Sequence, residues 1–374
     1  MLKEITAKSI LRPHKKIDSW FLSSYAINLY RGCLHNCVYC DGRNEKYQVE
    51  GEFGKDISVK RNAIDLLKKE LNPERKRKPF RNGFFMICGG ISDSYQPFES
   101  QQKLCRQTLE ILCQYKHPVH ILTKSILVER DLDLLLKINQ QQKAIVSFSF
   151  SSIDDKTSRL LEPGVPCPQE RLACLKRIKA AGLICGIYLM PLIPFITDSY
   201  EMINQTLQKA KEIGVDFVVM SGLTLKTGRQ KEYFLNFIKS SFPEYFSKYN
   251  QIYSDQNSWG APSGDSLQAI EKIFVQLATK YDLPKRIPLK IFSPLLSKKE
   301  QVLITLEQLD YLIKLKGEKS PYGYAAYSLS KIDNRLEEIS DQEFLSLKGV
   351  GPFTLKLIRE IIVTGRCRYY EKFL

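Results

Sequence analysis

The stretch AINLYRGCLHNCVYC, residues 26–40, decides the fold of this chain. Its apolar start predicts a buried strand over Ala26–Tyr30. The loop that leaves this strand carries three cysteines, Cys33, Cys37 and Cys40, within eight residues. We therefore expect a strand whose C-terminal end presents three thiols in one short loop.

Short apolar runs and amphipathic segments alternate from this stretch to about residue 223. Such alternation predicts parallel strands joined by crossover helices. Six units are too few for a closed eight-stranded barrel, so we expect an α/β fold with a partial (β/α)6 barrel of the TIM type. Its chemistry should lie at the C-terminal ends of the strands. The predicted strands are Ala26–Tyr30, Phe84–Ile87, Val119–Leu122, Ala144–Phe150, Ile184–Leu189 and Phe217–Met220, and the predicted helices are Asn62–Leu71, Gln101–Cys113, Leu127–Asn139, Pro168–Ala181 and Tyr200–Ile213.

The chain divides into four predicted regions, because the pattern after residue 225 is helical. These regions are an N-terminal extension (1–24), the partial barrel (25–225), a helical extension of the core (226–296) and a C-terminal helical module (297–374).

The composition narrows the class of protein. A formal net charge of +15 favours a polyanionic partner. The sequence shows neither an apolar run long enough to span a membrane nor a secretory signal, so we expect a cytoplasmic protein. Ten cysteines in that compartment argue against a disulfide framework. The seven outside the loop are expected to be small buried side chains.

The three clustered thiols suit an iron–sulfur cluster. Each thiolate can bind one iron of a cubane cluster, which normally takes four cysteine ligands. The missing ligand leaves one iron open, as in catalytic metal sites. A structural zinc site would need a fourth ligand, either His35 or a distant residue. We favour the cluster, with zinc or no metal as the alternatives.

The spacing Cys33-x₃-Cys37-x-Tyr39-Cys40 resembles the motif of the radical SAM superfamily. Within that superfamily the chain resembles the spore-photoproduct-lyase-like branch over roughly residues 7–295. The segments that carry this resemblance are Asn28–Cys33, Ser92–Glu99, Leu122–Ser125, Arg130–Asp133, Leu161–Pro163 and Pro191–Pro194.

The resemblance implies two cofactors, a [4Fe–4S] cluster on Cys33, Cys37 and Cys40 and S-adenosylmethionine (SAM) chelated to its open iron. An electron from a partner such as flavodoxin or ferredoxin would cleave SAM to a 5′-deoxyadenosyl radical. The implied SAM contacts come from the ends of successive strands. They are Tyr39 of the motif, Gly89 and Gly90 for close backbone approach, Ser92 and Asp93 for the amino group, Lys124 for the carboxylate, Ser149 and Ser151 for the ribose, and Pro191 and Leu192 for the adenine.

One position departs from the lyase pattern. The lyase carries a hydrogen-donating cysteine where this chain has Gly90, before Ile91-Ser92-Asp93. Cys88 lies two residues earlier and is expected to point elsewhere along the strand. We therefore expect a substrate other than the spore photoproduct.

The segment Leu345–Ile358 resembles a helix–hairpin–helix motif, within residues 340–365. Ser340 and Glu343 predict a capping box at the start of its first helix. Glycines allow a tight hairpin, and the free N–H groups there form an anion site that grips phosphates. The second helix should bury Phe353, Leu357, Ile358, Ile361 and Ile362. The predicted nucleic-acid contacts are Lys348, Gly349, Val350, Gly351, Lys356 and Arg359, with Arg366 and Arg368 adding charge.

These features favour a radical SAM enzyme of the lyase-like branch that acts on DNA or RNA. A second hypothesis keeps this chemistry and makes a protein or a small molecule the substrate. A third is a nucleic-acid-binding protein whose cluster is structural or redox-sensing.

Overall fold

The computed structural model describes residues 2–76, 78–88, 91–253, 259–263 and 266–374. An open sheet of seven strands, in the order β10-β9-β8-β7-β6-β3-β2, forms its centre. Strands β3 to β10 run parallel in this sheet, whereas the edge strand β2 pairs antiparallel with β3. The predicted partial (β/α)6 barrel is therefore confirmed. The strands are β2 (Leu11–Pro13), β3 (Ser23–Ile27), β6 (Phe84–Ile87), β7 (Val119–Thr123), β8 (Ala144–Phe150), β9 (Ile184–Leu192) and β10 (Phe217–Gly222).

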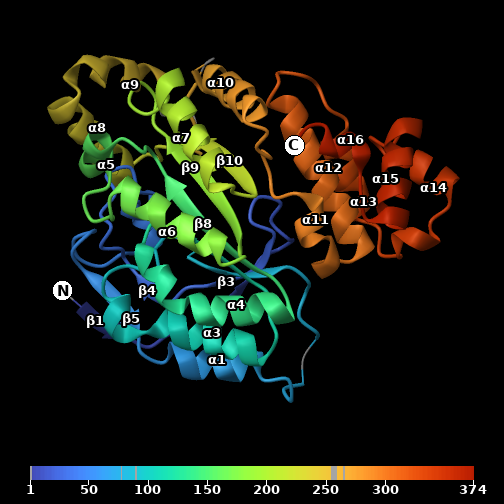
Figure 1. Ribbon diagram of the computed structural model, residues 1–374, viewed down its shortest axis with the longest axis horizontal. Helices are drawn as coiled ribbons and strands as arrows, with labels where there is room; N and C mark the ends of the chain where they lie inside the picture. The colour runs from blue at the N-terminus through green and yellow to red at the C-terminus, as the bar shows by residue number, and fades with distance from the viewer. Residues whose placement is uncertain (1, 77, 89–90, 254–258, 264–265) are drawn as a thin grey trace.

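One face of the sheet packs against a layer of helices, as Figure 1 shows. Side chains alternate along each strand, so that Ala144 and Val146 face these helices while Ile145 faces the interior of the barrel. The outer layer contains α1 (Ala63–Leu71), α3 (Leu104–Gln114), α4 (Leu132–Gln141), α6 (Pro168–Ala180), α7 (Tyr200–Ile213) and α10 (Ser266–Lys280).

The C-terminal helices pack against the inward-facing side chains of the barrel. Phe84, Ile145 and Phe217, near the starts of their strands, share one apolar cluster with these helices. The buried guanidinium of Arg286 lies between Trp20 and Tyr311, at 4.0 and 3.6 Å from the ring centroids. The module therefore fills the end of the barrel opposite the C-terminal ends of the strands. Its helices are α11 (Leu289–Phe292), α12 (Lys298–Lys314), α13 (Tyr322–Ser330), α14 (Asp341–Leu345), α15 (Pro352–Thr364) and α16 (Arg368–Glu371).

Two further helices, α8 (Arg229–Ser241) and α9 (Phe246–Ile252), cover the cysteine loop. Phe234 and Ile238 of α8 and Tyr249 of α9 form a third apolar cluster with Val38 and Tyr39 of that loop. The predicted helical extension of the core thus supports the loop from behind.

The N-terminal strands differ from the prediction. The expected strand Ala26–Tyr30 is divided, because Ser23–Ile27 forms β3 of the main sheet whereas Tyr30–Arg31 forms β4. Strand β4 joins a second sheet in the order β1-β5-β4, with β1 at Leu2–Ile5 and β5 at Ile57–Lys60. The residues before 25 therefore add two strands, one to each sheet. Their edge pairings are long-range and leave little local pattern in the sequence.

Two predicted helices are also divided. Lys103 has a left-handed backbone (φ +53°), so α2 (Glu99–Gln102) ends there before α3 begins. Residues Ile126–Asp131 form a 3₁₀ turn ahead of α4, and α5 (Asp155–Leu161) is an additional short helix. Phe353 was expected in the buried face of α15 but is half exposed, since it lies in the first turn. None of the described helices is both long and apolar enough to cross a membrane.

Candidate active site

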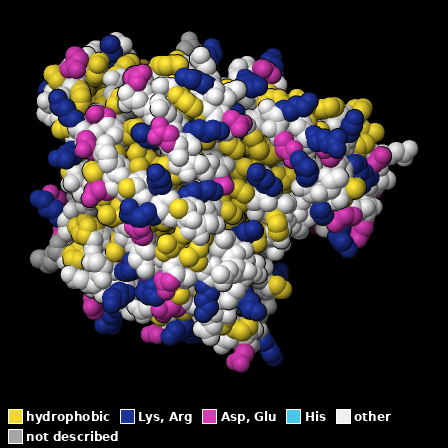
Figure 2. Space-filling model, viewed as in Figure 1, with side chains coloured by type: hydrophobic (Ala, Val, Ile, Leu, Met, Phe, Trp, Pro, Cys, Tyr) yellow, Lys and Arg dark blue, Asp and Glu magenta, His cyan; other side chains and the backbone are white. Residues whose placement is uncertain are grey.

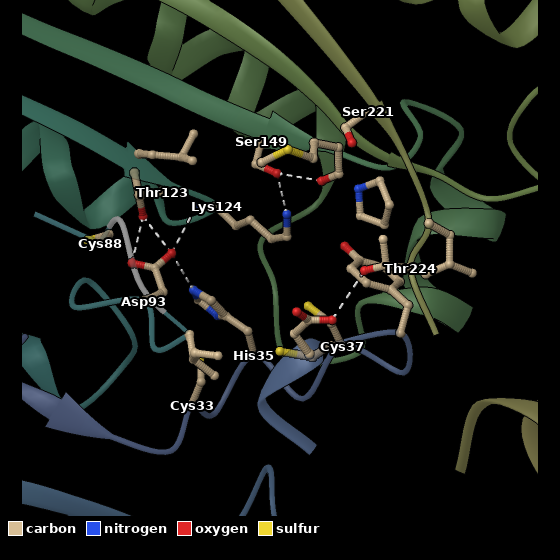
Figure 3. A pocket seen from close by; sticks show the side chains of 18 of the residues that line it. Cys33, His35, Cys37, Cys88, Asp93, Thr123, Lys124, Ser149, Ser221 and Thr224 are labelled. Carbon is tan, nitrogen blue, oxygen red and sulfur yellow. Dashed lines mark hydrogen bonds and ion pairs between the residues drawn. The ribbon is translucent and has the colours of Figure 1, made fainter. Parts of the chain in front are cut away.

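A cavity of about 590 Å³ opens at the C-terminal ends of the parallel strands, where chemistry is expected in this architecture. Its volume is in the range of small-molecule sites. All three loop cysteines lie on its wall, opposite polar residues from β7 and β8 (Figure 3). The residues that line it include Arg12, Cys33, His35, Cys37, Tyr39, Cys40, Asp41, Cys88, Asp93, Thr123, Lys124, Ser149, Met190, Pro191 and Thr224.

The cysteine loop is fixed by the loop after α5. The Gly164 N–H donates to the His35 carbonyl at 3.0 Å, and the Val38 N–H donates to the Leu161 carbonyl at 2.9 Å. A Cβ on Gly164 would lie only 2.1 Å from the Leu34 carbonyl oxygen, so the approach requires glycine. One distant segment, residues 161–164, thus holds the cysteine loop in place.

Arg43 braces the same loop from its other side. Its guanidinium donates to the Cys37 carbonyl at 3.2 Å and to the Asn36 side chain at 2.6 Å. It also stacks between Phe53 and Tyr233, with its central carbon 4.7 and 3.6 Å from their ring centroids.

The three thiols fit the cluster that the spacing predicts. Burial raises the pKa of each, that of Cys33 to about 12, so a positively charged group must displace their protons. Among the described residues, no three His, Cys, Asp or Glu side chains converge on a single metal ion, whereas in a cubane each thiolate binds an iron of its own. His35, the nearby fourth ligand of the zinc alternative, is occupied, since its ring nitrogens contact the Gly164 carbonyl at 3.1 Å and Asp93 at 3.0 Å. Three cavity-lining thiols without a histidine ligand match a cubane with one open iron.

The carboxylate of Asp93 already accepts several hydrogen bonds from the protein. Its carboxylate accepts hydrogen bonds from the ring of His35, from the Thr123 hydroxyl and from the Lys124 N–H, at 2.7–3.0 Å. Burial alone would raise its pKa, but these donors outweigh burial and hold the pKa well below its usual range. The carboxylate therefore ties the cysteine loop to the end of β7, and it still lines the cavity.

Lys124 lies on the cavity wall as expected. Its ammonium donates to the Ser149 hydroxyl at 2.6 Å (Figure 3). The same ammonium lies 3.6 Å from a carboxylate oxygen of Glu162. Ser149 therefore sits beside the predicted carboxylate contact, although the sequence suggested the ribose.

Glu162 is a buried residue beside the cavity to which the sequence analysis assigned no role. Its buried carboxylate accepts hydrogen bonds from Tyr39, from Ser151 at 3.0 Å and from Arg171 at 2.8 Å. Burial would raise its pKa, but Arg171 and Lys124 outweigh burial and lower the pKa to about 2. An ionised glutamate thus lies behind both the motif tyrosine and the cavity lysine. Its segment, Leu161–Pro163, was among those resembling the lyase branch, and this was the available signal.

Several predicted SAM contacts lie elsewhere. Ser151 is 1% exposed and faces Glu162, and Leu192 belongs to the core, whereas Pro191 lines the cavity. Ser92 lines a smaller, second cavity. Gly89 and Gly90 lie outside the described residues.

The position of Cys88 differs from the prediction. It lines the cavity and does not point away from it, because its backbone is left-handed (φ +64°) and departs from strand alternation. Of the other six cysteines outside the loop, Cys167 is half-buried, and the rest are buried as expected.

The predicted nucleic-acid contacts surround the turn between α14 and α15. Lys348 and Lys356 are exposed, and Val350 is buried. Gly349 has φ +88°, and a Cβ there would lie 2.5 Å from the Ala325 nitrogen. Arg359 is engaged, since it donates to Asp341 and to the Ile339 carbonyl, each at 2.6 Å. The capping box of Ser340 and Glu343 is present as predicted.

The fold is a partial α/β barrel with three cysteines on the wall of the cavity at the C-terminal ends of its strands. The family model of the radical SAM superfamily matches residues 27–210, and the chain belongs to that superfamily. Its cofactors are accordingly a [4Fe–4S] cluster and SAM.

Two relatives found by sequence are described only as uncharacterised proteins. A protein of Mycobacterium tuberculosis is 34% identical over 233 residues, which cover 61% of this chain and 67% of the relative. A protein of Methanocaldococcus jannaschii is 27% identical over 270 residues, which cover 72% of this chain and 93% of the relative.

Among solved structures, spore photoproduct lyase in complex with dinucleoside spore photoproduct has a similar fold. The TM-score is 0.56 at 15% identity, over 75% of this chain and 79% of the lyase. A variant of that lyase with bound AdoMet and dinucleoside spore photoproduct gives a TM-score of 0.55 at 16% identity, with the same coverage. At these identities the likeness concerns the fold.

Proposed function

We propose that this radical SAM enzyme acts on a nucleic acid, with Cys33, Cys37 and Cys40 as the cluster ligands. When bound, the cluster and SAM supply the one-electron cleavage that gives a 5′-deoxyadenosyl radical. The chain's own residues position SAM in the cavity. Lys124 supplies a cation for the SAM carboxylate, and Glu162 and Ser149 hold that ammonium in place.

The hairpin before α15 is the observation that carries the nucleic-acid substrate. Gly351 caps α15 without a side chain, so the first N–H groups of this helix are left for an anion. Lys348 and Lys356 flank the hairpin and are exposed, and Figure 2 shows further Lys and Arg side chains on the C-terminal module. A hairpin of this kind grips phosphates without reading sequence.

The lyase complex gives independent support. Spore photoproduct lyase binds a dinucleoside photoproduct, and its fold is similar to that of this chain. The net charge of +15 also favours a polyanion.

The test has two parts. Anaerobic incubation with SAM and dithionite should release 5′-deoxyadenosine, and no release from protein with confirmed cluster absorbance would mean a structural or redox-sensing cluster. Filter binding of a nucleic acid at several salt concentrations should show strongly salt-dependent affinity. No affinity for DNA or RNA at low salt would leave a protein or a small molecule as the substrate. Deuterium transfer from a labelled substrate into 5′-deoxyadenosine would then identify the substrate itself.

A further inference from the structure

A second cavity, of about 200 Å³, adjoins the active-site cavity, and the Arg12 side chain lines both of them. Its remaining wall comes from Pro13 and His14 of the N-terminal extension, from Ala26, Ile27 and Asn28 at the end of β3, and from Ser92. The wall thus contains cationic and neutral polar side chains and, among the described residues, no carboxylate.

Two further cations, Lys60 and Arg31, act together with Arg12 near this cavity. Lys60 lies behind Asn28, and its ammonium donates to the Asn28 carbonyl at 2.7 Å and to the Asn28 side chain at 3.2 Å. Burial, with the charges of Arg31 and Arg12 close by, lowers the pKa of Lys60 to about 8. Arg31 and Arg12 therefore both raise the positive potential at Lys60.

The carboxylates that influence His14 and Arg31 have other partners. Asp18 acts on His14, but its carboxylate accepts the N–H groups of Trp20 and Phe21. Glu50 is influenced by Arg31 but pairs with Lys3 at 2.5 Å. Within the described part of the chain, neither Arg12 nor Arg31 has an ion-pair partner. Arg31 and Lys60 are half-buried, and a bound anion would offset the cost of burying their charges.

We propose that this cavity binds a backbone phosphate of the nucleic-acid substrate, with Arg12 as its principal contact, and that it thereby sets which nucleoside enters the active-site cavity. The guanidinium fork matches the geometry of phosphate oxygens. Ser92 and Asn28 offer further donors on the same wall. Because Arg12 lies on both cavities, a nucleoside attached to this phosphate faces the wall that carries the three cysteines.

This inference rests on the proposed function, and the two can fail separately. The variant Arg12→Gln removes the fork from an exposed position on the edge strand β2, so the fold should tolerate it. Arg12→Lys keeps the positive charge but removes the planar guanidinium group. Arg177→Gln removes one positive charge from the exposed outer surface of α6 and serves as the matched control.

The assay is fluorescence anisotropy of a short fluorescein-labelled single-stranded oligonucleotide with reconstituted protein, at several salt concentrations. We expect Arg12→Gln to weaken binding by about 10-fold and to lower the salt slope by about one, as loss of one phosphate contact does. Arg12→Lys should recover part of the affinity, and Arg177→Gln should bind like the wild type.

Three outcomes would overturn the inference. Wild-type affinity in Arg12→Gln, combined with weak binding in Lys348→Gln, would place the phosphate contacts at the hairpin alone and leave the proposed function intact. Tight binding of inorganic phosphate that Arg12→Gln abolishes, without an effect on the oligonucleotide, would show a site for free phosphate. No oligonucleotide binding by the wild type would remove the proposed function as well.

Discussion

Glu162→Gln tests whether a buried carboxylate holds the cavity together. The substitution keeps the shape of the side chain and removes its charge, which leaves Arg171 and Lys124 without a carboxylate partner. Arg171 is fully buried, and its nearest other acceptors, the Ser149 carbonyl and the Ser158 hydroxyl, are neutral.

The expected loss of stability can be calculated from the site. The pKa of Glu162 falls from its ordinary value of 4.5 to about 2. That difference corresponds to roughly 3 kcal/mol in favour of the ionised form. Removing one partner of a buried ion pair typically costs about 3–5 kcal/mol, in agreement with this value. We therefore expect Glu162→Gln to lower the free energy of unfolding by about 3 kcal/mol.

Urea denaturation of the wild type and two variants measures this loss. Glu129→Gln is the matched control, because Glu129 pairs with Arg177 at 2.5 Å with both side chains partly exposed. Exposed pairs contribute little, so this variant should unfold near the wild-type midpoint. A loss in Glu162→Gln no larger than that in Glu129→Gln would refute the electrostatic account of the cavity.

Three other perturbations probe the same fold. Cys37→Ala should abolish cluster incorporation, measured as iron per protein, while circular dichroism keeps its wild-type shape; an unfolded spectrum would mean that the cluster is structural. Gly164→Ala should also reduce the iron content, because the new Cβ would lie 2.1 Å from the Leu34 carbonyl oxygen, and wild-type retention of iron would show that this contact is unimportant. His120 should make the fold acid-sensitive, since burial lowers its pKa from 6.5 to about 4 and the unfolded chain binds the proton more readily. Neutral His120 contributes roughly 3 kcal/mol to the free energy of unfolding. This contribution is present above pH 6.5 and is lost as the pH falls toward 4. In His120→Gln the midpoint of urea denaturation should change less over this pH range, and an unchanged pH dependence would contradict the role of His120.

The sequence predicted the local parts of this molecule well. Strand β8 and helix α7 have the predicted bounds, because their periodicity is strong and their ends are marked by turn residues. The cysteine spacing placed three thiols on one cavity wall. Both results follow from patterns that are contiguous along the chain.

The features that the sequence did not predict depend on contacts between distant residues or on local backbone conformation. Glu162 acquires its role from Tyr39 and Arg171, which no single window of sequence brings together. Ser92, which was predicted to contact SAM from its place after a strand, lines the second cavity. Cys88 was misassigned because strand alternation does not hold for a left-handed residue.

The stacking of Arg286 between Trp20 and Tyr311 has a consequence for the proposed binding of a nucleic acid. The guanidinium joins the N-terminal extension to α12, and the module shares its apolar core with the barrel. The hairpin therefore cannot swing on a tether as an appended binding domain would. If the substrate is the proposed nucleic acid, a strand held by the hairpin would meet the barrel at an angle that this packing limits.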